Sequence, residues 1–338
     1  MRKIAIILAS LLLSGTAYAQ LDYTFTNNNV VPFSLNPALA GNANAMRFGL
    51  DYRMQWPSLA NKYTTTRISF DENFYKQMAS IGVSIMRDNL ADIFKDNEIS
   101  AVYSHNVRLQ DGYFIRLGLQ VSLNLNYFSN DGITDDGYAY WLKGETPPST
   151  ENISNSCNYL DFSFGTAFVI ENKLTVGAAV YHIGEPNDGF EDKESQSLGR
   201  KYVFHVNYIQ DMESRSGLWG RRDLSSTYFF GSGSYQQQSV ETNTNGDTRV
   251  YRLAGLSVGA LTNPVLFGVS DKYDFSSSYG NLNVLSFMLG ANYKGLQAYY
   301  IFDLYTSKKD NGSWSHELSL VYVVPPKHYR YSCPIVYW

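Results

Sequence analysis

Beyond its first twenty residues the sequence has no long apolar run, little charge and almost no cysteine. A membrane-spanning helix needs roughly 18 or more apolar residues in a row, so the sequence predicts none. The two cysteines, Cys157 and Cys333, are too few for a disulfide scaffold, and their spacing gives no metal signature. Charged residues make up 17% of the chain and the net charge is -4, which argues against a nucleic-acid partner.

The first residues, MRKIAIILASLLLSGTAYAQ, have the three parts of a secretory signal peptide. Two cations, Arg2 and Lys3, precede an apolar stretch, and the small-x-small pattern AYA ends at Ala19. The apolar stretch is too short to cross a bilayer. We therefore expect residues 1–19 to be removed, with cleavage near Ala19/Gln20, and the mature chain to leave the cytoplasm.

Aromatic residues are abundant, at 15% of the chain, and apolar and polar side chains alternate along much of it. In GYFIRLGLQVSLNLNYF, residues 112–128, every second residue from Tyr113 to Tyr127 is apolar, and those between are mostly polar or small. This two-residue period predicts a β-strand with one apolar and one polar face. The same pattern recurs in YLDFSFGTAFVI, NVLSFMLGANY and LQAYYIFDLY.

Alternation and turn residues together predict about fourteen strands. Most of them approach the 9 to 11 residues that cross a bilayer at a tilt. No convincing amphipathic helix is found, although DENFYKQMA, residues 71–79, has room for one helical turn. The predicted strands are 46–56, 63–70, 80–87, 98–109, 112–128, 159–170, 173–183, 201–211, 223–237, 248–262, 265–273, 284–293, 296–305 and 316–324.

The connections between these strands are unequal. The shortest follow even-numbered strands, at Gln110-Asp111, Glu171-Asn172, Asn263-Pro264 and Lys294-Gly295. Long ones follow odd-numbered strands, at 129–158, 184–200, 238–247 and 306–315, and the connections 71–79 and 212–222 blur the pattern without reversing it. In an up-and-down meander, even and odd connections lie at opposite ends, so short turns at one end and long loops at the other indicate an outer-membrane barrel.

A soluble β-sandwich also alternates and is the main alternative fold. Its outer surface would need charge, whereas here the charged residues concentrate in loops and the polar faces carry Ser, Asn, Gln, Gly and Thr. A closed barrel also leaves no unpaired edge strand. We therefore predict an all-β fold, a transmembrane antiparallel up-and-down β-barrel over residues 46–324, with its apolar face toward lipid and its polar face toward a lumen.

A series of motifs runs along the chain: SLNPALAG (34–41) and RFGLDYRMQWPSL (47–59) come first, and IGVSIMRDN, VGAAVYHIGEPN, HELSLVY and a late Cys-Pro follow. In type and order these motifs resemble the PorP/SprF family of outer-membrane proteins, which belongs to the type IX secretion and gliding system of the Bacteroidetes. Leu39 departs from the aromatic residue usual at its position. We expect a structural role for the N-terminal family motif, which comprises Asn36, Pro37, Gly41, Arg53, Gln55 and Trp56.

The resemblance implies a fourteen-stranded barrel in the outer membrane of a Gram-negative, Bacteroidetes-like cell. It also implies a part in protein secretion or gliding motility, because some members work with the secretion machinery. Others pair with an exported surface protein, such as an adhesin, and hold it through that protein's C-terminal domain. The expected partners are thus outer-membrane lipid, a secreted type IX substrate and periplasmic machinery lipoproteins, with no nucleic acid.

Two segments flank the predicted barrel. Residues 20–45 do not alternate, yet they carry many apolar side chains, so they form either a plug in the lumen or a periplasmic segment. The turn at Asn36-Pro37 either directs this peptide into the barrel or contacts a partner. The tail, residues 325–338, begins with two prolines and cannot simply extend the sheet, and we expect it in the periplasm.

No catalytic, metal or cofactor site is predicted. Ser104 and His105 are neighbours on a strand and point to opposite faces, so they do not form a catalytic pair. The acidic loop 130–137 lacks the spacing of a calcium loop. His182 and Glu185 lie where a strand meets a loop, and a loop-anchoring hydrogen bond is the favoured interpretation.

The favoured function is a non-enzymatic anchor for a secreted partner. Long loops, chiefly 129–158 and 184–200, would meet this partner, with the aromatic residues Tyr138, Tyr140 and Trp141 as interface anchors. One alternative is a channel for small solutes, which requires an open lumen. Another is a structural component that contacts the periplasmic secretion machinery. The sequence also leaves open the partner's identity, the oligomeric state and the role of both cysteines.

Overall fold

The computed structural model describes residues 25–43, 45–57, 63–90, 94–128, 156–170, 173–189, 197–211, 227–241, 248–262, 264–276, 283–306 and 313–324. Nearly all of these residues are in strands. Three short 3-10 helices accompany them: η1 (Pro32–Ser34), η2 (Pro37–Leu39) and η3 (Tyr75–Gln77). Within the described ranges, no helix has the length and apolar character needed to cross a membrane.

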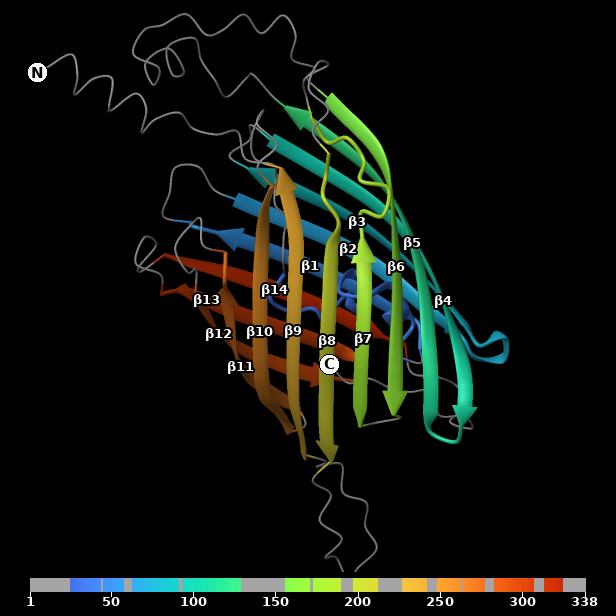
Figure 1. Cartoon of the computed structure of the whole chain (residues 1–338). Coiled ribbons are helices and arrows are strands. Elements are labelled where there is room, and N and C mark those ends of the chain that lie inside the picture. Colours follow the sequence, from blue (N-terminus) through green and yellow to red (C-terminus); the bar gives the residue numbers. More distant parts are fainter. Residues whose placement is uncertain are drawn as a thin grey trace, which may run out of the picture.

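Fourteen antiparallel strands form one closed barrel, as predicted (Figure 1). Each strand pairs with its sequence neighbours, and the first pairs with the last, from Arg47 opposite Val323 to Gln55 opposite Ser315. Closure leaves no free edge. The strands are β1 (Arg47–Gln55), β2 (Tyr63–Phe74), β3 (Ala79–Leu90), β4 (Phe94–Gln110), β5 (Tyr113–Phe128), β6 (Ser156–Ile170), β7 (Leu174–Tyr181), β8 (Lys201–Asp211), β9 (Thr227–Glu241), β10 (Thr248–Thr262), β11 (Val265–Asp274), β12 (Asn283–Tyr293), β13 (Leu296–Tyr305) and β14 (Trp314–Val323).

The two faces of the wall follow the predicted alternation. The apolar set points outward, and the polar set between points inward, where its side chains are buried. This outward apolar surface is the one that a barrel presents to lipid. Outward residues include Leu117, Leu119, Val121, Leu123, Leu160, Phe162, Phe287 and Leu289, each between 37% and 59% exposed; inward ones include Gln120, Ser122, Asp161, Ser163, Ser286 and Asp303.

The two ends of the barrel differ. We call the end with the connections after β2, β4, β6, β8, β10 and β12 the turn end, and the other the loop end. The β4–β5 and β6–β7 connections lie together at the bottom of Figure 1. At Lys294-Gly295 both residues have positive φ, 50° and 88°, as a two-residue hairpin turn of the right twist requires.

Several boundaries differ from the predictions. The tight turn between β4 and β5 is Asp111-Gly112, not Gln110-Asp111, because Gly112 adopts the positive φ of 79°. Residues 71–79 are mainly a hairpin: β2 continues to Phe74, which pairs with Ala79, and η3 forms the turn. β9 covers Thr227–Glu241 instead of 223–237, because it pairs along the whole of β10. The strand therefore continues from Gln238 to Glu241, past its predicted end.

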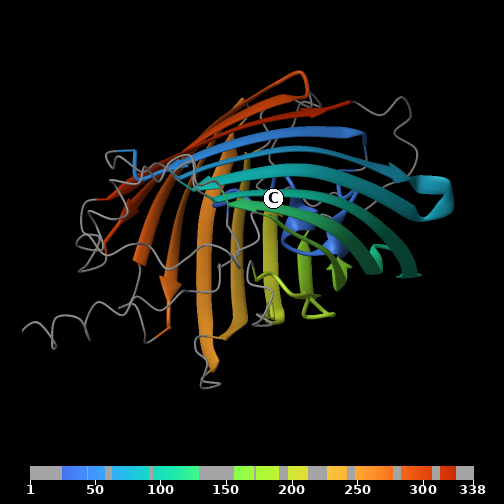
Figure 2. The ribbon, with the colours of Figure 1, turned by 90° about the horizontal axis from the view of Figure 1, so that it is seen from above.

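Residues 25–43, which we call the lumenal segment, lie inside the ring of strands (Figure 2). The segment runs from the level of Arg53 and Glu317, toward the loop end, down to Asp71 near the turn end, and the chain then enters β1. Most of its side chains are buried. The barrel therefore encloses a peptide of its own chain.

Candidate functional site

The lumenal segment is built from two 3-10 turns set by proline. Pro32 and Pro37 each begin a turn at a position where the missing N–H costs nothing. Asn36 caps η2: its side-chain oxygen accepts a hydrogen bond from the N–H of Ala38 at 2.9 Å. The Asn-Pro pair therefore fixes a compact turn whose buried side chains meet the wall on several sides.

Glycines in β5, β6 and β7 make room for this turn. A methyl group added at Gly118 would collide with the main chain of Pro37 and Ala38, and one at Gly165 would collide with the Asn36 side chain. The same Asn36 donates from Nδ2 to the carbonyl of Thr166 at 3.0 Å, and it lies 3.0 Å from the Nε2 atom of His205. A methyl group at Gly177 would likewise collide with the Asn36 amide, so the family motif packs against β5, β6 and β7 and reaches His205 of β8.

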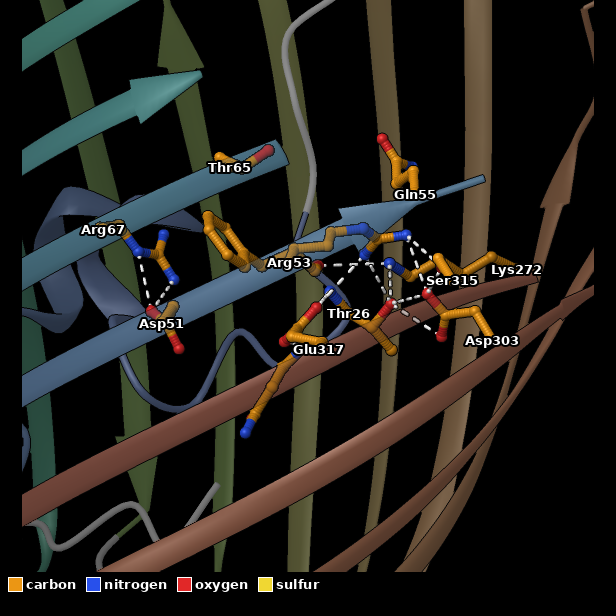
Figure 3. A network of polar contacts seen from close by, with 12 residues as sticks. Thr26, Asp51, Arg53, Gln55, Thr65, Arg67, Lys272, Asp303, Ser315 and Glu317 are labelled. Atoms are coloured by element: carbon orange, nitrogen blue, oxygen red, sulfur yellow. Dashed lines mark hydrogen bonds and ion pairs between the residues drawn. The ribbon is translucent and has the colours of Figure 1, made fainter. Parts of the chain in front are cut away.

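A charged cluster holds the beginning of the segment (Figure 3). The carboxylate of Glu317 accepts the main-chain N–H groups of Thr26 at 2.8 Å and Asn27 at 2.9 Å. Arg53 pairs with Glu317 at 3.2 Å and with Asp303 at 2.8 Å, and it donates to the Thr26 hydroxyl at 3.0 Å. All three charged side chains are almost completely buried.

Lys272 completes this cluster from β11, which is separated from β13 only by β12. Its Nζ donates to the carbonyl of Phe25 at 3.2 Å and to the Thr26 hydroxyl at 3.3 Å. The cluster therefore contains two cations and two carboxylates around one turn of peptide. Burying a charge without a partner is costly, so this balance is what permits four ionisable groups inside the lumen.

Two further ion pairs between β1 and β2 hold the rest of the segment. Arg47 pairs with Asp71 through two contacts of 2.7 Å, and the same carboxylate accepts the N–H of Gly41 at 2.7 Å. Gly41 has a φ of 68°, which glycine adopts without strain. Arg47 and Asp71 thus hold the segment where it leaves the lumen and enters β1.

The second pair, Arg67 with Asp51, is formed at 2.8 Å. The guanidinium of Arg67 also donates to the Ser34 hydroxyl at 2.9 Å and lies 4.1 Å from the ring of Phe25. A cation over an aromatic face is attractive, and more so away from water. Each ion pair on β1 and β2 thus has a contact with the lumenal segment as well as with its own partner.

Apolar side chains fill the lumen near the turn end. Val30, Val31 and Phe33 of the segment are at most 1% exposed. They belong to one buried cluster with residues of six strands: Val102, Ile209, Phe230, Leu266, Tyr299 and Val321. Removal of this apolar surface from water stabilises the packed segment. The arrangement closes much of the lumen with packed side chains and binds peptide through main-chain hydrogen bonds.

The remaining predicted site residues lie near the loop end or outside the described residues. Gln55 donates to the hydroxyl of Tyr305 at 3.0 Å, and Trp56 packs on the same ring. The imidazole of His182 contacts Asp161 at 2.9 Å, while Glu185 joins His182 by a main-chain bond of 3.0 Å. Tyr138, Tyr140, Trp141, the tail 325–338 and Cys333 lie outside the described ranges. Cys157 lies in β6, so the preceding connection ends at residue 155.

Sequence reasoning missed the partners of Arg53. Asp303, Glu317 and Lys272 were not singled out, although a charged residue on the inward side of an alternating strand was a usable signal. Asp303 stands opposite the apolar set in LQAYYIFDLY, and Glu317 stands opposite Leu318 in HELSLVY. The sequence does not reveal the strand register. This register brings the charged residues of β11, β13, β14 and β1 together around Phe25, Thr26 and Asn27.

Comparison with known proteins gives a family and a fold. The model of the family described as "Type IX secretion system membrane protein PorP/SprF" matches residues 17–322. No curated protein matches the chain. Among solved structures, the Ralstonia pickettii toluene transporter TbuX is similar with a TM-score of 0.53 at 9% identity, over 86% of this chain and 92% of that one.

A FadL homologue from Pseudomonas aeruginosa is also similar, with a TM-score of 0.46 at 11% identity, over 90% of this chain and all of that one. At such identities the TbuX likeness supports the fold of an outer-membrane barrel and nothing about what passes through it. The family match, which covers most of the chain, carries the functional assignment.

Proposed function

The chain belongs to the PorP/SprF family of type IX secretion system membrane proteins, and from this premise we propose that it anchors, or helps to export, a secreted cell-surface protein through that protein's C-terminal domain. In this role the barrel is non-enzymatic. Its apolar belt fixes it in the outer membrane, and the loop end faces the cell exterior. The signal peptide and its cleavage near Ala19/Gln20 belong to the same proposal.

One observation carries the proposal, namely the peptide locked inside the barrel. Residues 25–43 are held in the lumen by main-chain hydrogen bonds to Glu317 and Asp71 and by the hydrogen bond from Arg67 to the Ser34 hydroxyl. An apolar layer at the turn end adds packing. A barrel filled in this way is poorly suited to free diffusion of solutes. It is well suited to present surface, because a rigid interior fixes the strand ends from which the long loops leave.

We place the partner contact on the connection between β5 and β6. Tyr138, Tyr140 and Trp141 lie in it, and large aromatic side chains with polar neighbours dominate many protein interfaces. His182 and Glu185 act at the neighbouring loop: the imidazole of His182 joins the start of this loop to Asp161 of β6. This assigns binding to the long loops and support to the strand ends beneath them.

The test is the amount of exported protein that remains on the cell. A triple variant, Tyr138→Ala, Tyr140→Ala and Trp141→Ala, should release it into the medium, with a loss of retention of about tenfold or more if these residues are interface anchors. The matched control, Ser149→Ala with Thr150→Ala, changes the same loop without removing aromatic surface. Unchanged retention in the triple variant, with the barrel folded in the membrane, would contradict the proposal.

The first alternative, a component of the export machinery, can be distinguished from the anchor role by the proteins that co-purify with the barrel. After cross-linking of intact cells, the anchor role requires a secreted surface protein to co-purify with the barrel. Recovery of periplasmic machinery alone would favour the machinery role. The small-solute channel has weaker support, since the TbuX likeness extends to the fold only and the lumenal segment occupies the path.

A further inference from the structure

The lumenal segment does not fill the whole lumen. Its turn η2 packs against β4, β5 and β6, and a hollow remains between the segment and the wall of β8 to β12. The hollow extends from Phe230 and Met288, near the turn end, to Thr26 and Lys272, near the charged cluster. Its outer wall is one continuous piece of sheet, and its inner wall is the lumenal segment.

Small polar side chains dominate the outer wall of the hollow. Ser232, Ser234, Ser257 and Ser270 contribute hydroxyl groups from three adjacent strands. Gly268 lies near them, and the side chains of Met288 and Phe230 cover it at the turn-end side of the hollow. Hydroxyls both donate and accept hydrogen bonds, so this wall suits a ligand with donors and acceptors in alternation.

Two buried amides on the inner wall point to a ligand independently. Asn27 and Asn42 line the hollow and are each 1% exposed. Among the described residues, the Nδ2 atom of Asn27 and the Oδ1 atom of Asn42 have no hydrogen-bond partner. A buried donor and a buried acceptor left unpaired are costly, and such groups are normally satisfied. The two amides thus leave one donor and one acceptor without a partner in residues that line the hollow.

The opposite half of the lumen shows which ligand such a wall binds. There, side chains bind the main chain of the lumenal segment: Ser104 donates to the carbonyl of Ala38 at 3.0 Å, and Tyr181 donates to that of Ser34 at 3.0 Å. Gly118 lies against the main chain itself. The hollow offers hydroxyl and amide groups of the same kind, and the segment's contacts with its outer wall, among the described residues, lie at the two ends, at Lys272 and at Phe230.

Charge restricts the ligand further. The cluster at the upper edge of the hollow is balanced, since Arg53 and Lys272 match Asp303 and Glu317 (Figure 3). An added charge would be buried without a partner, which is costly. We propose that the hollow binds a second peptide, an extended and uncharged polar segment of the exported partner. This inference rests on the proposed function and adds to it the part of the partner that enters the lumen.

The test places a photo-cross-linker on each face of one strand in the full-length protein in its own membrane. Ser257→p-benzoylphenylalanine faces the hollow, and Leu256→p-benzoylphenylalanine faces lipid, where Leu256 is 70% exposed. After irradiation, the lumenal position should form an adduct with the secreted protein that co-purifies with the barrel, and the lipid position should form none. Peptide mapping should locate the adduct in an uncharged polar segment.

Any other outcome contradicts the inference, and the outcomes differ in whether they also contradict the anchor role. If the secreted protein co-purifies but Ser257 gives no adduct, or an adduct in a charged or folded region, the lumen is not its site while the anchor role stands. If no secreted protein co-purifies, both fail. A second variant, Ser257→Phe, should fill the hollow and lower surface retention about tenfold, or about 1.4 kcal/mol in affinity. Leu256→Phe is its control, and equal retention in both contradicts the inference.

Discussion

At the scale of single residues, the lumen is organised by charges that have both a partner in the wall and a contact with the lumenal segment. Glu317 illustrates this, because it pairs with Arg53 and also accepts two main-chain N–H groups. Asp71 does the same between Arg47 and Gly41. Buried pairs contribute little net stability when complete, but breaking one leaves a charge without compensation.

Replacing Glu317 should therefore be strongly destabilising. Glu317→Gln keeps the shape of the side chain and removes one of the two carboxylates beside Arg53 and Lys272. We expect a loss of about 3–5 kcal/mol in the free energy of unfolding, the range for breaking a buried pair. The measurement is the denaturant midpoint of the purified barrel in detergent. Asp111→Asn, a carboxylate in the exposed turn between β4 and β5, should change it by about 1 kcal/mol or less. Equal effects would contradict the role of burial.

Glycine in the wall should matter only where the lumenal segment touches it. Gly118→Ala places a methyl group against the main chain of Pro37 and Ala38, and overpacking of this kind costs about 1–3 kcal/mol. Gly231→Ala is the matched control, because its methyl group would meet only the Ser257 carbonyl at 3.9 Å. Unfolding midpoints of the two variants give the comparison. A destabilised Gly231→Ala variant would indicate a general need for glycine in the strands instead of a fit to the segment.

At the scale of elements, the strands could be predicted from the sequence and the contents of the lumen could not. A strand in a barrel wall has one face in lipid, so the sequence of β5 alone shows its period and its outward side. The polar end of β2, DENF, was missed because it resembles a loop, and the end of β9 was predicted at residue 237, four residues too early; pairing with β3 and β10 extends both strands.

The lumenal segment has no period to read. Its 3-10 turns leave apolar residues at irregular spacing, and the sequence therefore left open a place in the lumen or in the periplasm. Motif resemblance singled out Asn36, Pro37, Gly41 and Arg53, which the structure brings into or beside the segment. The partners of Arg53 come from strands about 250 residues away in sequence, and no local pattern links them.

Removing the segment should turn the barrel into a conducting one. Deletion of residues 25–43 removes the apolar layer of Val30, Val31 and Phe33 and leaves a lumen lined by hydroxyl, amide and charged groups. Planar-bilayer recordings should show steady current from the deletion variant and little from the full chain. Because the deletion also strips contacts from buried charges, a milder variant, Asn36→Ala, accompanies it and should give intermittent current. A folded deletion variant without conductance would contradict the blocking role of the segment.

At the scale of the whole molecule, the barrel is a boundary between two solvents, and the cost of a charge on its outer face should depend on depth. Leu119 lies near the middle of β5 and is 58% exposed on the outward face. Leu119→Arg should cost about 2–4 kcal/mol, because the guanidinium would lie in hydrocarbon, while Tyr127→Arg, at the loop end of the same face, should cost about 0–1 kcal/mol.

Folding of these two variants into lipid vesicles, followed by denaturant titration, measures both costs on one strand. The comparison holds the introduced side chain, the strand and the face constant, and the variants Leu119→Ala and Tyr127→Ala correct for the loss of different native side chains. Equal costs at Leu119 and Tyr127 would mean that the outward face does not meet a membrane interior. The placement of the loops outside, and with it the partner assigned to them, would then lose its physical basis, because only an apolar belt fixes which residues lie beyond the membrane.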